Sequence, residues 1–303
     1  MPNWNKVMGE MAVLAQKSPF DTVRSKYIKE MSQLTGRNVI AYYSGFLQKN
    51  SQSNQHLISM TDDDKNGFMA AIHGLNPELG LDLILHTPGG DIAALESIGY
   101  YLRAKFGKNI RAFVPMISMS AGTMLACCAK EIIMGKQSNI GPFDPQVGGV
   151  PAHGVLEESQ NALQDILKNP ASAAYWQFTL SKLNPTFIGE CQKAIQWATT
   201  IVSDWLVTGM FDGDADAHTK AEAICASLNN HSSTFAHARH IHIDKALQIG
   251  LNITAMESNQ DLQDLVLTIH HSFMHTFGNS SAAKIIENQE DGRMVWHVPP
   301  NGH

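Results

Sequence analysis

Two short motifs in the first half of the chain carry residues suited to acyl-transfer chemistry. Residues 118–123, Ser-Met-Ser-Ala-Gly-Thr, join an apolar run to a run of small residues, and Ser120 lies at the turn between them. Residues 86–91 read His-Thr-Pro-Gly-Gly-Asp, and the pair Gly89 and Gly90 can turn backbone N–H groups toward a substrate oxygen. An activated serine and a backbone anion hole are the two components that acyl transfer requires.

Each motif follows a predicted β-strand and precedes a predicted helix. The apolar run 81–86 predicts a buried parallel strand, and a helix is expected over 92–106. The next strand is expected over 111–119 and the next helix over 123–129. Alternation at this spacing indicates right-handed βαβ units.

The remaining elements are predicted with the same rules. Before the first motif we expect helical spacing over 4–34, a strand over 38–46 and a helix from Asp62-Asp63-Asp64 to about His73. After the second motif we expect a short strand over 131–134, a Pro- and Gly-rich loop over 141–151, and a long helical region over 152–206 that is interrupted near Asn184-Pro185. The remainder predicts a helix over 217–228, a helix ended by Gly250 and followed by a strand, a helix over 262–277, and a hairpin over 283–298 that turns at 290–292.

Composition describes a globular protein of 303 residues with 44% hydrophobic and 17% charged residues. A net charge of −6 and the lack of a Lys/Arg run argue against a nucleic-acid partner. No signal peptide or membrane span is expected, because the longest near-apolar stretch, 116–129, is too short for a bilayer. The four cysteines contain no Cys-x-x-Cys motif, so we expect reduced core thiols in a cytoplasmic protein.

Three motifs, 87–91, 120–123 and the Ile-Gly-Pro-Phe-Asp-Pro-Gln segment 140–146, occur in an order that resembles the Clp protease/crotonase superfamily. Within it, the chain is similar to the serine dehydrogenase proteinase family, relatives of signal peptide peptidase A. The resemblance implies an α/β fold, a crotonase-type spiral of βαβ units with additional C-terminal helices. It implies an N-terminal helical segment over 1–37, a peptidase domain over 38–255, and a C-terminal helix and tail over 256–303 packed on the same domain.

The same resemblance implies roles for individual residues. Ser120 would be the nucleophile, and the backbone N–H groups of Gly90 and Ala121 would form the oxyanion hole, with Gly89 shaping the turn. Where Clp-type enzymes place their histidine, this chain carries Asp144. Relatives of signal peptide peptidase A use a lysine on the following helix, and the comparable position here is His153.

The general base is the least determined part of this site. His153 would lie in the first turn of a helix opened by Pro151, where the helix dipole keeps an imidazole neutral and basic. Lys168 is the alternative, and about 22 Å along one helix would separate it from His153, so both cannot serve Ser120. Asp144 could orient the base, and Ser118 is the alternative nucleophile.

These residues predict a serine endopeptidase that acts on peptides or unfolded proteins. The resemblance implies a homo-oligomer, and any ATPase partner would be a separate chain, because no Gly-x-x-x-x-Gly-Lys-Ser/Thr motif occurs. We expect no cofactor and no metal, although His271 and His275 are spaced i, i+4 and His237, His240 and His242 cluster. The alternatives are a thioester or acyl hydrolase on the same fold and an inactive scaffold that binds peptides.

Overall fold

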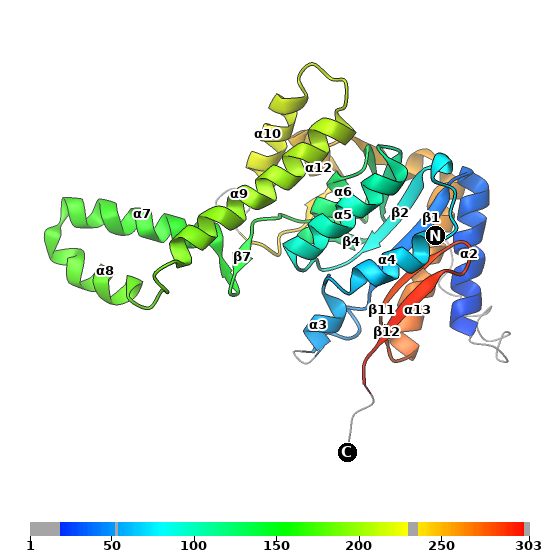
Figure 1. Ribbon diagram of the computed structural model, residues 1–303, viewed down its shortest axis with the longest axis horizontal. Coiled ribbons are helices and arrows are strands. Elements are labelled where there is room, and N and C mark those ends of the chain that lie inside the picture. Colours follow the sequence, from blue (N-terminus) through cyan, green and yellow to red (C-terminus); the bar gives the residue numbers. More distant parts are fainter. Residues whose placement is uncertain (1–18, 52–53, 230–235, 300–303) are drawn as a thin grey trace.

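A seven-stranded mixed sheet forms the centre of the computed structural model, which describes residues 19–51, 54–229 and 236–299 (Figure 1). In spatial order the strands are β10 (Ile253–Ala255), β5 (Glu131–Met134), β3 (Ile110–Val114), β2 (Leu81–His86), β1 (Asn38–Ser44), β11 (Ala282–Asn288) and β12 (Arg293–His297). The strands from β10 to β1 are parallel, and β11 and β12 add an antiparallel hairpin at the β1 edge. The C-terminal segment is therefore part of the same sheet as the candidate site.

Helices cover both faces of this sheet, so the parallel strands are buried on both sides. Alternate residues of β1 point to opposite faces, with Tyr42 in the core on one side and Tyr43 in the core on the other. The first face carries α4 (Asp64–Ile72), α5 (Ile92–Phe106), α6 (Ala121–Cys127), α9 (Phe187–Trp205), α10 (Ala217–Leu228) and α12 (Ile243–Ile249). The second face carries α2 (Pro19–Thr35) and α13 (Gln260–Asn279).

The predicted βαβ elements agree with the structure most closely around the glycine motif. Strand 81–86 and helix 92–106 have the predicted bounds. The predicted strand 111–119 is divided, because the chain leaves the sheet after Val114 and forms β4 (Ile117–Ser118), which pairs with β6 (Asn139–Ile140) next to β9 (Ile241–His242). This departure places Ser120 past the carboxyl ends of β2 and β3, outside the main sheet. The predicted helical residues 4–18 lie outside the described residues.

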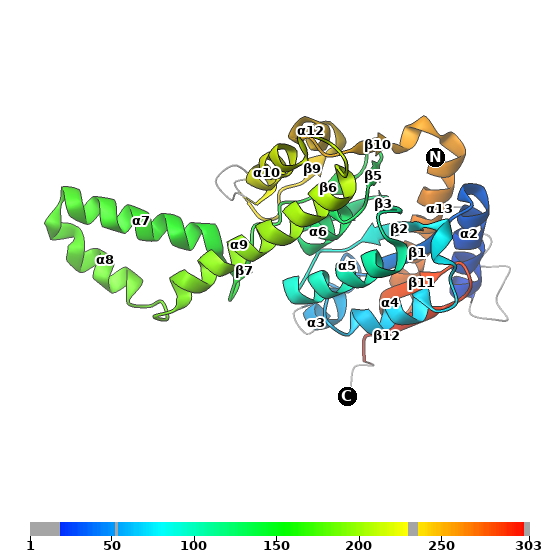
Figure 2. The same ribbon diagram turned by 45° about the horizontal axis from the view of Figure 1, so that its top comes forward.

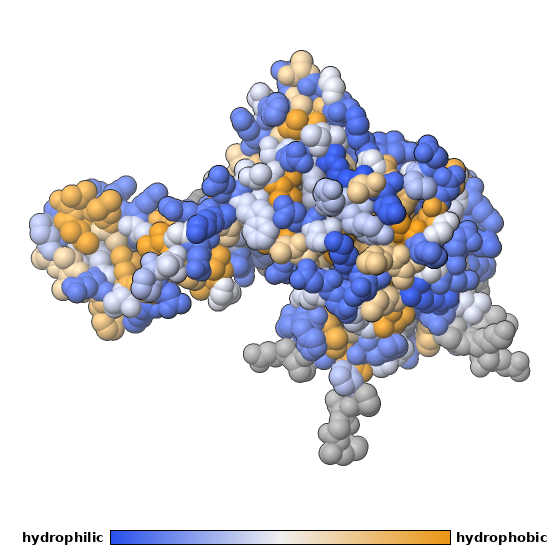
Figure 3. Space-filling view, viewed as in Figure 1, coloured by the Kyte–Doolittle hydropathy of each residue, from blue (hydrophilic) through white to orange (hydrophobic). Residues whose placement is uncertain are grey.

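The predicted helical region 152–206 forms an arm and a long helix. Helices α7 (Ala152–Lys168) and α8 (Ala173–Leu180) project from the body in both ribbon views, and α9 returns to it (Figures 1 and 2). An additional break occurs at Asn169-Pro170, because a residue before proline is disfavoured in helical conformation. Four apolar side chains on this arm are 62–74% exposed: Leu163, Leu167, Tyr175 and Phe178. Orange patches mark the arm in the space-filling view (Figure 3).

Buried imidazoles lie between the sheet and α13. His86, at the end of β2, is fully buried, and its ring lies 5.0 Å from the ring of His270 on α13. Burial lowers the pKa of His86 to about 3 and outweighs the nearby Ile117 backbone, which acts in the opposite direction. Burial, followed by the neighbouring His86 and His271, lowers the pKa of His270 well below its usual value. Both rings are therefore neutral in the folded protein at neutral pH.

We expect acid to destabilise this fold through the same two histidines. Below the unfolded-state pKa of about 6.5, the unfolded chain binds protons that folded His86 and His270 exclude, so stability falls as the pH falls toward 3. His86 contributes about 1.4 kcal/mol between pH 7.5 and 5.5, and His270 acts in the same direction. Urea unfolding at one protein concentration and at both pH values measures this effect, and His86→Leu should reduce the difference in stability between the two pH values by about 1.4 kcal/mol. An unchanged pH dependence in His86→Leu would contradict the assignment.

Candidate active site

Ser120 occupies a strained turn between β4 and α6. Its backbone angles are φ 50° and ψ −119°, and only one other non-glycine residue in the described part of the chain, Asp291, has positive φ. Such a conformation costs about 1–3 kcal/mol and occurs preferentially at functional sites. Ser120 is partly exposed, and its hydroxyl has no hydrogen-bond partner among the described residues. The turn therefore presents a free hydroxyl at the start of a helix, as a nucleophile elbow does.

The glycine pair packs directly against this turn. A Cβ atom on Gly89 would lie 2.8 Å from the Cβ of Ser120 and 2.7 Å from the carbonyl oxygen of Met119. A Cβ atom on Gly90 would lie 2.3 Å from the carbonyl oxygen of Met60. No larger side chain fits at either position without displacing backbone, so both positions require glycine.

Two backbone N–H groups beside Ser120 lack an acceptor. Met60 donates to the Gly89 carbonyl (2.8 Å) and accepts from Asp91 (3.0 Å), and this pairing skips the N–H of Gly90. The N–H of Ala121 lies in the first turn of α6. Neither N–H donates a hydrogen bond to any other described group. Backbone donors are rarely left unpaired, so these two are available to a substrate oxygen.

One cleft of about 670 Å³ brings these groups together. Its described lining includes Ser120, Ala121, both glycines and His237. Apolar side chains form another part of its wall: Met60, Ile92, Met124, Phe143 and Ala194. The cleft therefore combines a hydroxyl, two N–H donors, an imidazole and an apolar surface of a size suited to a side chain of a substrate.

The imidazole in this cleft is held by a buried carboxylate. His237 Nδ1 lies 2.9 Å from Asp144 Oδ1, and Asp144 is buried. An ionised carboxylate only accepts hydrogen bonds, so Nδ1 carries the proton and Nε2 is the basic nitrogen. Asp144 is kept in place by its loop, in which Phe143 N donates to Leu228 O (3.0 Å) and Ala152 N donates to Pro145 O (2.9 Å).

The structure does not bring the two predicted bases to this cleft. His153 lines a separate cavity of about 520 Å³ between α7, α9 and α10, where its Nε2 lies 3.4 Å from Asn229 Oδ1. Lys168 is exposed and ends α7 at the outer end of the arm. Ser118, the alternative nucleophile, is fully buried on β4. Of the predicted residues, Ser120, Gly89, Gly90 and Ala121 share one cleft, and Asp144 bonds to His237, which lines it.

Sequence reasoning did not identify His237 as the partner of Asp144 in this cleft. The residue belongs to the cluster of histidines noted above, but 93 positions separate it from Asp144, and no local motif marks it. The order serine, aspartate, histidine along the chain was the available signal, and it becomes specific only when the fold places the three residues together.

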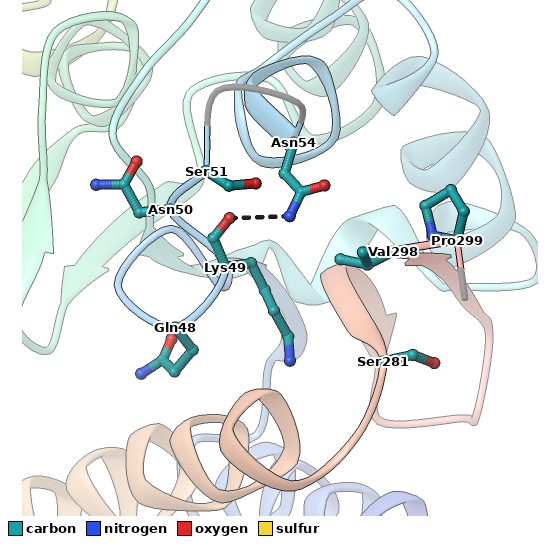
Figure 4. A pocket seen from close by; sticks show the side chains of 8 residues that line it. All are labelled: Gln48, Lys49, Asn50, Ser51, Asn54, Ser281, Val298 and Pro299. Carbon is teal, nitrogen blue, oxygen red and sulfur yellow. Dashed lines mark hydrogen bonds between the residues drawn. The ribbon is translucent and has the colours of Figure 1, made fainter. Parts of the chain in front are cut away.

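The other cavities offer less chemistry. One of about 370 Å³ beside β12 is lined mainly by amides, hydroxyls and Lys49 (Figure 4). The Lys49 side chain donates to Ser280 O at 2.7 Å. Within the described ranges, no group of three or more His, Cys, Asp or Glu side chains is placed to hold a metal ion. No helix in the same ranges combines the length and apolar character needed to cross a membrane.

Similarity to known proteins shows the family to which the chain belongs. Residues 14–274 match the family model described as ClpP-like SDH-type serine proteinase. Two uncharacterized proteins of Methanocaldococcus jannaschii, MJ1495 and MJ0137, are 39% and 37% identical over 98 residues, which is 32% of this chain and 33% and 34% of those proteins. The chain thus spans about a third of each relative. No solved structure matches it significantly. The family match confirms the predicted fold class, and the chain belongs to the ClpP-like SDH-type serine proteinases.

Proposed function

We propose that this chain is a serine endopeptidase that hydrolyses peptide bonds through an acyl-enzyme on Ser120, with His237 as general base and Asp144 as its orienting carboxylate. One observation carries the proposal: a single cleft holds a free serine hydroxyl, two unpaired backbone N–H groups and a carboxylate-bound imidazole. Family membership supports the same reaction class. The proposal replaces His153 with His237 as the base.

The reaction follows from these groups. Nε2 of His237 takes the proton of Ser120 as Oγ attacks the peptide carbonyl, and the N–H groups of Gly90 and Ala121 stabilise the developing oxyanion. The imidazolium gives its proton to the leaving amine, which releases the first product and leaves the acyl ester. His237 then deprotonates water, which attacks the ester, and the serine recovers its proton. Asp144 holds the productive tautomer throughout.

The lining of the cleft favours peptides over coenzyme A thioesters. Its described residues include no lysine and no arginine, which a ligand with several phosphates would require. An inactive scaffold would have no use for the strained Ser120 backbone, which a relaxed residue could replace. We propose that the protein acts in the cytoplasm, because all four of its cysteines are free thiols buried in the fold, as is usual in a reducing compartment. A separate ATPase partner also remains a proposal.

Ser120→Ala should abolish both hydrolysis of a fluorescent casein and labelling by a fluorophosphonate, with the fold retained. Losing the nucleophile should lower the rate by several orders of magnitude. Peptide mapping of the labelled wild type locates the adduct, and far-UV circular dichroism checks the fold. Labelling that persists in Ser120→Ala, or an adduct on Ser118, would refute the assignment.

His237→Ala should lower the labelling rate by about a hundredfold or more, whereas His153→Ala should retain most of the activity. The two alanine variants are matched controls for each other. Loss of activity in His153→Ala with activity retained in His237→Ala would restore the base predicted from the sequence.

We further propose that the arm joins copies of this chain into a homo-oligomer, because within a single copy its apolar side chains are exposed to solvent. Light scattering should give a mass several times 33.2 kDa. Leu167→Glu and Phe178→Glu should lower that mass, whereas Leu247→Glu, an exposed leucine on the body, should not. A wild-type monomer at micromolar concentration would contradict the oligomer.

A further inference from the structure

The segment Ser59–Thr61 supports the glycine loop of the cleft. Met60 forms both backbone hydrogen bonds that flank Gly90, at 2.8 Å and 3.0 Å, and is itself fully buried. The position of the Gly90 N–H therefore depends on the position of this short segment. Contacts that hold Ser59 and Thr61 in place therefore also position the Gly90 N–H, which is one donor of the proposed anion hole.

A buried ion pair forms hydrogen bonds to this segment on both sides of Met60. Lys284, on β11, pairs with Asp64, the first residue of α4, and both side chains are almost completely excluded from solvent. Lys284 Nζ also donates to Ser59 O at 2.9 Å. Asp64 Oδ2 accepts from the Thr61 N–H at 3.1 Å.

The Asp64 carboxylate is also connected to the glycine loop through Tyr42 and Thr87. Tyr42, on β1, donates its hydroxyl hydrogen to Asp64 Oδ2 at 2.8 Å, and its ring stacks on Phe68 of α4. Burial and the neighbouring Asp64 raise the pKa of Tyr42, whereas the side chain of Thr87 acts in the opposite direction, which indicates that the Thr87 hydroxyl lies beside the Tyr42 hydroxyl. The Thr87 hydroxyl oxygen in turn accepts from the N–H of Gly89 at 3.1 Å. Charged hydrogen bonds in a buried chain of this kind are strong and directional.

We propose that Tyr42, Asp64 and Lys284 form a positioning network that sets the backbone of Gly89 and Gly90 for oxyanion binding. This inference rests on the proposed function, since it assigns the network to that anion hole. A buried ion pair often adds little net stability compared with apolar residues of similar volume, so we assign this pair a role in fixing the local backbone. None of the three residues is among those that line the cleft, and they act through residues 59–61 and Thr87.

The first test removes one oxygen atom. Tyr42→Phe keeps the stacked ring and removes the hydroxyl that donates to Asp64 and lies beside Thr87, so the second-order rate of Ser120 labelling by a fluorophosphonate should fall about tenfold. With fluorescent casein, kcat should fall while KM changes little, because the anion hole acts mainly in the transition state. Tyr43→Phe is the matched control, since that hydroxyl is buried on the opposite face without a hydrogen-bond partner among the described residues.

The second test removes the ion pair as a unit. Asp64→Leu/Lys284→Met replaces both charges with apolar groups and avoids the unfolding expected when one buried charge is left alone. Its labelling rate should fall about tenfold or more. Arg24→Met/Glu287→Leu is the control pair, because Glu287 lies on the same strand and its buried partner Arg24 belongs to α2, on the other side of the sheet. Urea unfolding compares the stability of the two double variants.

The outcomes separate the two proposals. Slower labelling in both network variants, with wild-type rates in both controls, supports the positioning network. Wild-type labelling rates in Tyr42→Phe and in the Asp64/Lys284 pair, with the adduct still on Ser120, would overturn the network and leave the proposed function intact. An equal loss in the Arg24/Glu287 control would overturn it as well. A wild type that is not labelled at Ser120 would overturn the proposed function and the network with it.

Discussion

The close approach of the Gly89 backbone to the Ser120 turn is the constraint on which the rest of the site depends. The approach is possible only without a Cβ on Gly89, and it coincides with a strained backbone at Ser120. A turn of this kind persists only when its surroundings over-determine it. Here β2 and β4 carry the two loops, and the Thr87–Ser118 bridge joins them at their ends.

Support for this contact comes from parts of the chain that are distant in sequence. The C-terminal hairpin adds β11 to the edge of the sheet, and β11 carries Lys284 toward the segment that holds Gly90. Leu228, at the end of α10, accepts from the loop that carries Asp144. The site therefore depends on the whole domain, although the cleft itself is formed by a few loops.

The local parts of this arrangement could be predicted from the sequence, and the long-range parts could not. Strand 81–86, helix 92–106 and the Ser120 turn follow from apolar runs, glycines and small residues, which act over a few neighbours. The contact of His237 with Asp144 depends on how β6 and β9 pair, which no local pattern encodes. His153 was the predicted base because it stands at a helix start, but that helix belongs to the arm, where His153 lines another cavity.

The most direct measurement of the central claim is a high-resolution structure of the fluorophosphonate adduct. The account predicts phosphorus bonded to Ser120 Oγ, the phosphonyl oxygen about 2.7–3.1 Å from the backbone nitrogens of Gly90 and Ala121, and His237 Nε2 facing the adduct. An adduct on another residue, or a phosphonyl oxygen turned away from both nitrogens, would contradict it.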